Sequence, residues 1–99
     1  MGHLPQKLQE IRKLDIDDLL ILMMFGDGCS FTEIADALCL TTPAIYQRAY
    51  KIKSIWGDKI VFPHRRLKLR MSPYLQGKAS RARVVLKELN SWFEDKEVI

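Results

Sequence analysis

The chain has 99 residues, of which 47% are hydrophobic and 28% are charged, and its formal net charge is +4. A chain of this length forms one small domain, which excludes a cofactor-binding fold joined to a separate substrate domain. The composition excludes intrinsic disorder, and the longest apolar run, residues 19–25, is too short to cross a bilayer. We therefore expect residues 1–99 to form a single cytoplasmic module with no membrane partner.

The reactive side chains are few and scattered. Cys29 and Cys39 have neither CxxC spacing nor a neighbouring His pair, so they predict buried free thiols rather than a metal site. His3 and His64 lie far apart, with no acidic, Ser or Cys partner at a recognisable catalytic spacing. The sequence therefore predicts no enzyme activity, no metal and no cofactor, and we expect no small-molecule ligand within this chain.

Positive charge is concentrated in one part of the chain. Residues 41–83 contain 11 of the 16 basic residues and one of the 12 acidic residues, Asp58. Such a block is typical of a surface that binds a polyanion. The alternative is a charged face that only keeps the protein soluble, although such faces usually interleave both signs.

Two helices are expected in the N-terminal part. Apolar residues at helical spacing predict the first over residues 4–14. Asp15 then caps a second helix over residues 16–25, whose early acidic residues suit the positive end of the helix dipole. This second helix is apolar nearly all round, which places it in the core, and Gly26 ends it.

The next two helices are closely coupled. Ser30 and Glu33 have the spacing of a capping box, which predicts a helix over residues 31–38. After a two-residue turn, Thr41 caps a further helix over residues 42–56. Two short helices separated by so short a turn indicate a helix-turn-helix.

The helix over residues 42–56 has two different faces. Four of its residues recur at helical spacing and are expected in the core: Ile45, Ala49, Ile52 and Trp56. The opposite face carries hydroxyl, amide, ring and ammonium groups, from Thr42, Tyr46, Gln47, Tyr50, Lys51 and Lys53.

After residue 57 the spacing of the apolar residues changes from helical to alternating. Residues 60–62 form a short β-type run, residues 63–66 a basic turn, and Leu67, Leu69 and Met71 alternate with basic residues. The pattern predicts a β-hairpin over residues 58–71 whose apolar face leans on the helices, because an isolated hairpin is marginally stable.

A long last helix is expected over residues 73–94, with Ser72 as its N-cap. Its apolar residues follow a heptad seam: Leu75, Ala79, Ala82, Leu86, Leu89 and Phe93. At about 1.5 Å per residue this helix is longer than so small a core needs. We therefore expect part of the seam to pack on a second copy, giving a homodimer.

The stretch GCSFTEIADALCLTTPAIYQRAYKIKSIWG is similar to the winged helix-turn-helix of LysR-type transcriptional regulators. The residues that fall on the family motif are Ser30, Phe31, Ala35, Leu38, Thr41, Pro43, Ala44, Ile45, Ile52 and Gly57. The stretch FPHRRLKLRMSP resembles the family's wing and its exit into the linker helix. The N-terminal DNA-binding domain of molybdate-responsive regulators is similar in arrangement.

This resemblance implies a mainly α fold with a small β-hairpin, a winged helix-turn-helix followed by a long C-terminal linker and dimerisation helix. It covers residues 19–89, so the helix over residues 4–14 has no counterpart. Tyr46, Ala49, Lys53 and His64 depart from the family's usual residues. These departures concern the DNA sequence that is recognised more than the mode of docking.

The resemblance also implies the roles of individual residues in binding double-stranded DNA. Base contacts in the major groove are expected from Thr42, Pro43, Tyr46, Gln47 and Tyr50. Backbone and wing contacts are expected from Thr41, Arg48, Lys51, Lys53, His64, Arg65, Arg66 and Lys68. Two alternatives stay open: Tyr46 and Tyr50 stack on each other or on the wing, and Arg48 pairs with an acid of the N-terminal half.

The implied function is transcriptional regulation by a DNA-binding homodimer in the cytoplasm, at the nucleoid. One alternative is a winged-helix module that uses its basic face to bind an acidic protein. Another is the DNA-binding end of a larger recombinase or transposase. The three readings share the exposed face of the helix over residues 42–56.

Overall fold

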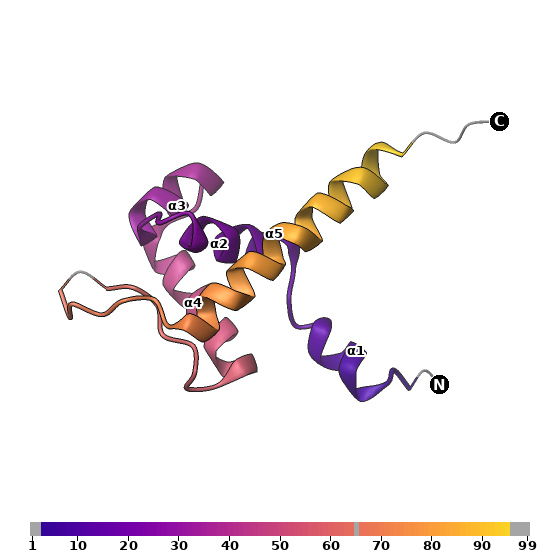
Figure 1. The fold of residues 1–99 in the computed structure, drawn as a ribbon, viewed down its shortest axis with the longest axis horizontal. Coiled ribbons are helices and arrows are strands. Elements are labelled where there is room, and N and C mark those ends of the chain that lie inside the picture. The colour runs from indigo at the N-terminus through magenta and orange to yellow at the C-terminus, as the bar shows by residue number, and fades with distance from the viewer. Residues whose placement is uncertain (1–2, 65, 96–99) are drawn as a thin grey trace.

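A computed structural model describes residues 3–64 and 66–95 (Figure 1). Within these residues the fold is all-α, and its helices in chain order are α1 (Gln6–Ile11), α2 (Ile16–Gly26), α3 (Phe31–Leu38), α4 (Thr42–Trp56) and α5 (Pro73–Glu94). None of the helices in the described part of the chain combines the length and the apolar character that crossing a membrane requires.

Local capping sets where the helices begin. The Ser30 hydroxyl accepts from the Glu33 N–H at 3.1 Å, and the Glu33 carboxylate accepts from the Ser30 N–H at 2.9 Å. This confirms the predicted capping box of α3. Asp15 caps α2 as predicted, and Asp18 completes a second capping box that the sequence analysis did not anticipate.

The turn between α3 and α4 is as short as predicted. Cys39 ends α3 in the left-handed conformation, with φ of 56°, and the Leu40 N–H donates to the Ala35 carbonyl at 2.9 Å. Thr41 then caps α4 through its hydroxyl, which accepts from the Ala44 N–H at 3.2 Å. The prediction that Cys39 is buried is wrong, because this turn lies on the surface and exposes the thiol.

The core lies where α2 crosses the first half of α5, and α3 and α4 close it from the other side (Figure 1). It comprises Ile21, Leu22 and Phe25 of α2, Ile34 and Ala35 of α3, Ile45 and Ile52 of α4, Ile60, and Leu75 and Ala82 of α5. The inward face predicted for α4 is therefore confirmed, with Ile45, Ala49 and Ile52 buried and Trp56 half-buried.

The predicted β-hairpin over residues 58–71 is wrong: between the described residues of this segment there is one isolated antiparallel bridge, His64 to Leu69. The next hydrogen-bonded pair of such a ladder would join Phe62 and Met71, and no backbone hydrogen bond links these two residues. The backbone of Val61 is taken up by the cap of α5, because its N–H donates to the Ser72 hydroxyl and its carbonyl accepts from the Ser72 N–H. The segment is a loop that one bridge closes.

The apolar residues of this loop do not lean on the helices as expected. Leu67 is 66% exposed and Leu69 is 46% exposed, whereas Met71 is half-buried against the core. Lys68 adopts φ of 52°, a left-handed conformation, and directly precedes the bridged residue Leu69.

The two ends of the chain project from this core. The first helix is shorter than the predicted 4–14, since α1 has six residues, none of them buried. Helix α5 has the predicted bounds, and its two halves differ: Ala82 is 3% exposed, whereas Phe93 near its end is 84% exposed. The second half of α5 extends away from the other helices (Figure 1).

Candidate nucleic-acid interface

The outer face of α4 is open to solvent. Tyr46 is 44% exposed, Tyr50 is 78% exposed, and Gln47 and Lys53 are also exposed. Of the other predicted base-contacting residues, Pro43 is exposed and Thr42 is half-buried at the N-terminus of the helix. All five predicted base-contacting residues lie within the first nine residues of α4, and four of the five are exposed.

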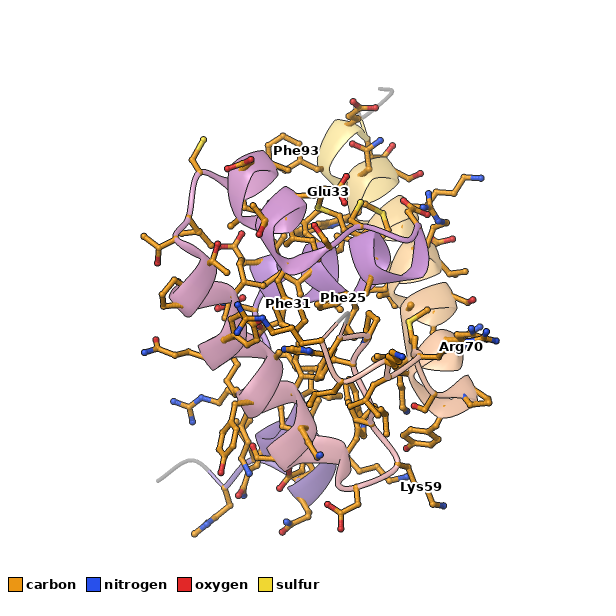
Figure 2. The ribbon with its side chains drawn as sticks, turned by 90° about the vertical axis from the view of Figure 1, so that its left-hand side faces the viewer. Phe25, Phe31, Glu33, Lys59, Arg70 and Phe93 are labelled. Carbon is orange, nitrogen blue, oxygen red and sulfur yellow. The ribbon has the colours of Figure 1, made fainter. Side chains whose placement is uncertain are left out.

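The Tyr46 ring is fixed by a residue from the preceding helix. It stacks on Phe31 of α3, with ring centroids 4.1 Å apart and planes 10° from parallel. Phe31 in turn meets Phe25 edge to face at 4.9 Å, and Figure 2 shows these two labelled residues near the centre of the molecule. Tyr46 thus stacks on α3 rather than on Tyr50 or the loop, because Phe31 covers one of its faces.

Arg48 and Lys51 are held by the acids at the start of α2. Nη1 of Arg48 lies 2.7 Å from Oδ2 of Asp15 and 3.3 Å from Oδ1 of Asp18, and its Nη2 lies 3.6 Å from Oδ2 of Asp17. Nζ of Lys51 lies 2.5 Å from Oδ2 of the fully buried Asp18. The alternative that Arg48 pairs with an acid of the N-terminal half is confirmed.

These contacts change the acid-base properties of the pair. The hydrogen bond from Arg48 holds the pKa of the Asp15 carboxyl below its usual value. The same hydrogen bond raises the pKa of Arg48. Both groups therefore stay charged at neutral pH, and together they tie the middle of α4 to the start of α2.

A second group of basic residues takes part in no ion pair between described residues. We call it the free basic group; it comprises Lys53, His64, Arg66, Lys68 and Arg70. Arg65, another predicted contact, lies outside the described residues. Side chains of Tyr46, Tyr50 and Lys53 line one groove together with His64 and Leu69. The outer face of α4 and the loop thus form one continuous surface.

Sequence reasoning missed two contributors to this surface. Phe31 packs against the core and also stacks on Tyr46, a contact that the sequence analysis did not anticipate. An acidic partner for Arg48 was left open, but the sequence analysis did not identify the acids at the start of α2 as that partner, nor Asp18 as a partner of Lys51. Among the described residues, no group of three His, Cys, Asp or Glu side chains is placed to hold a metal ion.

Comparison of the chain with models of protein families, with curated proteins and with solved structures found no match.

Proposed function

We propose that this protein binds double-stranded DNA in a sequence-specific manner and regulates transcription as a homodimer in the cytoplasm. The observation that carries the proposal is the exposed outer face of α4, where Tyr46 lines one groove with Lys53 and another with the basic residues of the loop. An exposed helix with hydrogen-bonding side chains fits the major groove, and neighbouring cations supply affinity for phosphates. The similarity of the motif to LysR-type regulators supports the same reading.

In this proposal the N-terminal half of α4 faces the base edges. The amide of Gln47 makes a bidentate contact with adenine, and the rings of Tyr46 and Tyr50 contact thymine methyl groups. Stacking on Phe31 favours Tyr46 as a reader, because a ring that is already fixed loses little rotamer freedom on binding. Thr42 and Pro43 contribute from the first turn of the helix.

Phosphate contacts come from Lys53 and from the loop residues His64, Arg66 and Lys68. Arg48 and Lys51 are assigned a different role, since their charges are already balanced by the carboxylates of α2. They hold α4 in place rather than bind phosphate. The loop acts where the family places its wing, with one backbone bridge instead of a paired sheet.

The test is selection of bound duplexes from a random pool, followed by footprinting of the selected sequence. The expected result is a dyad-symmetric consensus, bound with an affinity that falls by about 0.9 log units per neutralised phosphate for each log unit of salt. Gln47→Ala should change the preferred base at one position in each half-site, whereas Gln76→Ala, an exposed glutamine on α5, should not.

Other outcomes would contradict the proposal. Binding that is undetectable at low salt, or that is insensitive to salt, would exclude DNA as the partner of the basic surface. An unchanged base preference in Gln47→Ala, together with tight binding to an acidic protein, would favour the protein-binding module.

A further inference from the structure

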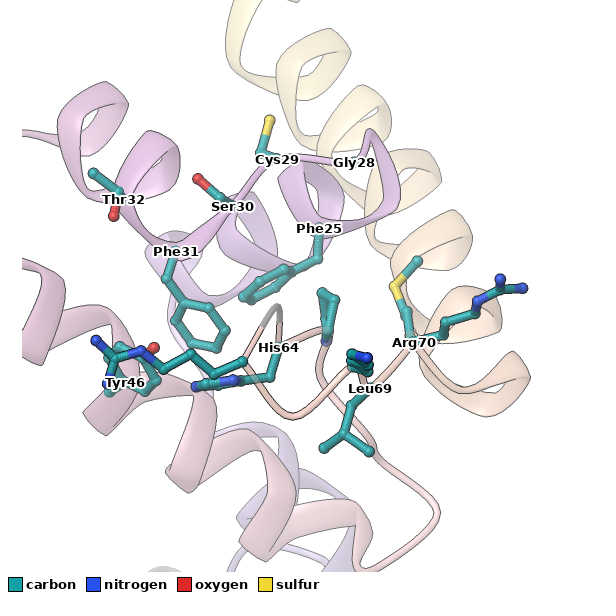
Figure 3. A pocket seen from close by; sticks show the side chains of 14 residues that line it. Phe25, Gly28, Cys29, Ser30, Phe31, Thr32, Tyr46, His64, Leu69 and Arg70 are labelled. Carbon is teal, nitrogen blue, oxygen red and sulfur yellow. The ribbon is translucent and has the colours of Figure 1, made fainter.

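A second groove shares Phe31 and Tyr46 with the first and lies between the link from α2 to α3 and the described loop residues 63–64 and 66–71. Its volume is about 880 Å³. Figure 3 shows Phe25 and Phe31 reaching into it from the helices, with His64 and Leu69 on the opposite side. A volume of this size falls within the range of about 300–1,000 Å³ that is typical of small-molecule sites.

The inner wall of this groove is aromatic. Phe25 is almost completely buried and contacts Phe31 edge to face, with ring centroids 4.9 Å apart. The ring centroid of Phe62 lies 5.1 Å from that of Phe25, so the two rings are also in contact. Leu69 and Met71 of the loop add aliphatic surface. A flat apolar group placed here would lie against Phe31, Leu69 and Met71, with Phe25 packed behind Phe31 in the core.

The outer rim of the groove is cationic. Its lining includes the cations Arg66, Lys68 and Arg70 together with His64, and it includes no acidic residue. None of these four side chains takes part in an ion pair between described residues. The rim therefore offers guanidinium and ammonium donors to an anion, and an arginine can bind a carboxylate or phosphate through two parallel hydrogen bonds.

We propose that this groove binds a small anion that carries a planar aromatic ring, with the ring against Phe31 and Leu69 and the carboxylate or phosphate against Arg66 and Lys68. Duplex DNA fits the groove less well, since its phosphates lie outside and its base faces are stacked within the helix. A small aromatic anion satisfies the aromatic wall and the cationic rim at once. Binding here goes beyond the proposed DNA-binding function and does not depend on it.

The test begins with 2-naphthoate titrated into the ¹⁵N-labelled full-length protein and followed by two-dimensional NMR, without DNA. We expect saturable shifts of the Phe31 and Leu69 amide signals, with a dissociation constant on the order of 0.1–1 mM. Adenosine monophosphate, titrated in parallel, distinguishes a phosphate head group from a carboxylate. The uncharged 2-naphthamide and ring-free inorganic phosphate should each bind about tenfold more weakly, because the first lacks the negative charge and the second lacks the aromatic ring.

Matched variants separate specific binding from general attraction. Arg66→Gln should weaken 2-naphthoate about tenfold, whereas Arg81→Gln, an exposed arginine on α5 outside the groove, removes the same charge and should leave binding unchanged. Phe31→Leu should weaken both naphthyl probes alike, and its NMR spectrum reports whether the fold is intact. If Phe31→Leu does not fold, the comparison of 2-naphthoate binding by Arg66→Gln and Arg81→Gln still tests the proposal.

The proposal is overturned if neither 2-naphthoate nor adenosine monophosphate gives saturable shifts at millimolar concentration. Equal binding of 2-naphthoate and 2-naphthamide, or equal effects of the two arginine variants, would also overturn it. Because these titrations contain no DNA, their failure is independent of the duplex selection. Where both functions hold, a bound anion should compete with duplex DNA, since both use Arg66 and Lys68.

Discussion

At the scale of single residues, the buried carboxylate of Asp18 is the group in the described part of the chain that most needs partners to replace its hydration. Its side chain is fully buried, and it is the sole buried charged residue among those described. It accepts from the Asp15 N–H at 3.0 Å and contacts both Arg48 and Lys51. A buried charge is tolerated only when such partners replace its lost hydration.

Removing one of these partners should therefore destabilise the protein. Arg48→Ala leaves the Asp18 carboxylate with less compensation, and we expect the free energy of unfolding to fall by about 2–3 kcal/mol. Lys53→Ala on the same helix removes an exposed cation that is in no ion pair between described residues, and should change it by less than about 0.5 kcal/mol. Urea denaturation of both variants measures the difference, and equal effects would contradict this role for Arg48.

The same cluster should make stability depend on pH. The pKa of Asp15 is lower in the folded protein than in the unfolded chain, because Arg48 donates to its carboxylate. Its contribution is therefore fully present above about pH 4, the usual Asp value, and is lost as pH falls through the folded-state pKa. Asp15→Asn should reduce this acid-induced loss of stability in urea denaturation, whereas Asp36→Asn, an exposed acid on α3, should retain it.

At the scale of elements, the closest helix approach involving a glycine is between α2 and α5. A Cβ built on Gly26 would lie 2.9 Å from the Cβ of Ala79, which is closer than real Cβ atoms come. Neither atom can swing aside, so any larger residue at position 26 must push the two helices apart. Gly77 on α5 is different, since a Cβ there meets nothing within 4 Å.

Alanine substitutions at these two glycines should change the free energy of unfolding in opposite directions. Gly26→Ala should lower the free energy of unfolding by about 1–3 kcal/mol, because it forces α2 away from α5. Gly77→Ala should raise it by about 0.5–1 kcal/mol, because it restricts the unfolded chain and adds no clash. Thermal unfolding of the two variants tests the pair, and stabilisation by Gly26→Ala would show that the helices separate at little cost.

The helices were predictable from the sequence because their signals are local. Ser30, Thr41 and Ser72 set the starts of α3, α4 and α5, and each acts on a backbone N–H only three residues further along the chain. The absence of a hairpin over residues 58–71 could not be predicted in this way. Alternating apolar and basic residues favour a strand, but they do not show whether a partner backbone is available to pair with it. Here the cap of α5 occupies the backbone of Val61.

The candidate site was predictable only in part, for a related reason. The exposed face of α4 follows from helical periodicity, since its residues are neighbours along one helix. The pairing of Arg48 with Asp15 spans 33 positions, and the Phe31–Tyr46 stack joins two helices. Such contacts depend on how helices cross, which no local pattern records.

At the scale of the whole molecule, the structure is elongated. Its radius of gyration is 15.1 Å, compared with about 13 Å for a compact domain of 100 residues. Both α1 and the second half of α5 project from the core (Figure 1), and near the end of α5 Trp92 and Phe93 are 74% and 84% exposed. Leu86 and Leu89 of the same half are only half-buried.

We expect this half of α5 to pair with a second copy. Leu89→Asp places a charge on the seam and should weaken the dimer more than about tenfold, because the carboxylate would be desolvated without a partner. Asn90→Asp adds the same charge at the neighbouring exposed position and should leave the dimer intact. Sedimentation equilibrium of both variants and the unchanged protein tests this, and a monomer at high micromolar concentration in all three would contradict it.

The exposed thiol of Cys39 gives direct access to the spacing of two such copies. It lies two residues before the cap of α4, whereas Cys29 is half-buried and burial raises the pKa of its thiol, which lowers its reactivity. A nitroxide attached through a disulfide would therefore mark Cys39 selectively. Dipolar coupling between the two nitroxides of a dimer would then report whether the paired helices stand about 34 Å apart, one turn of B-DNA.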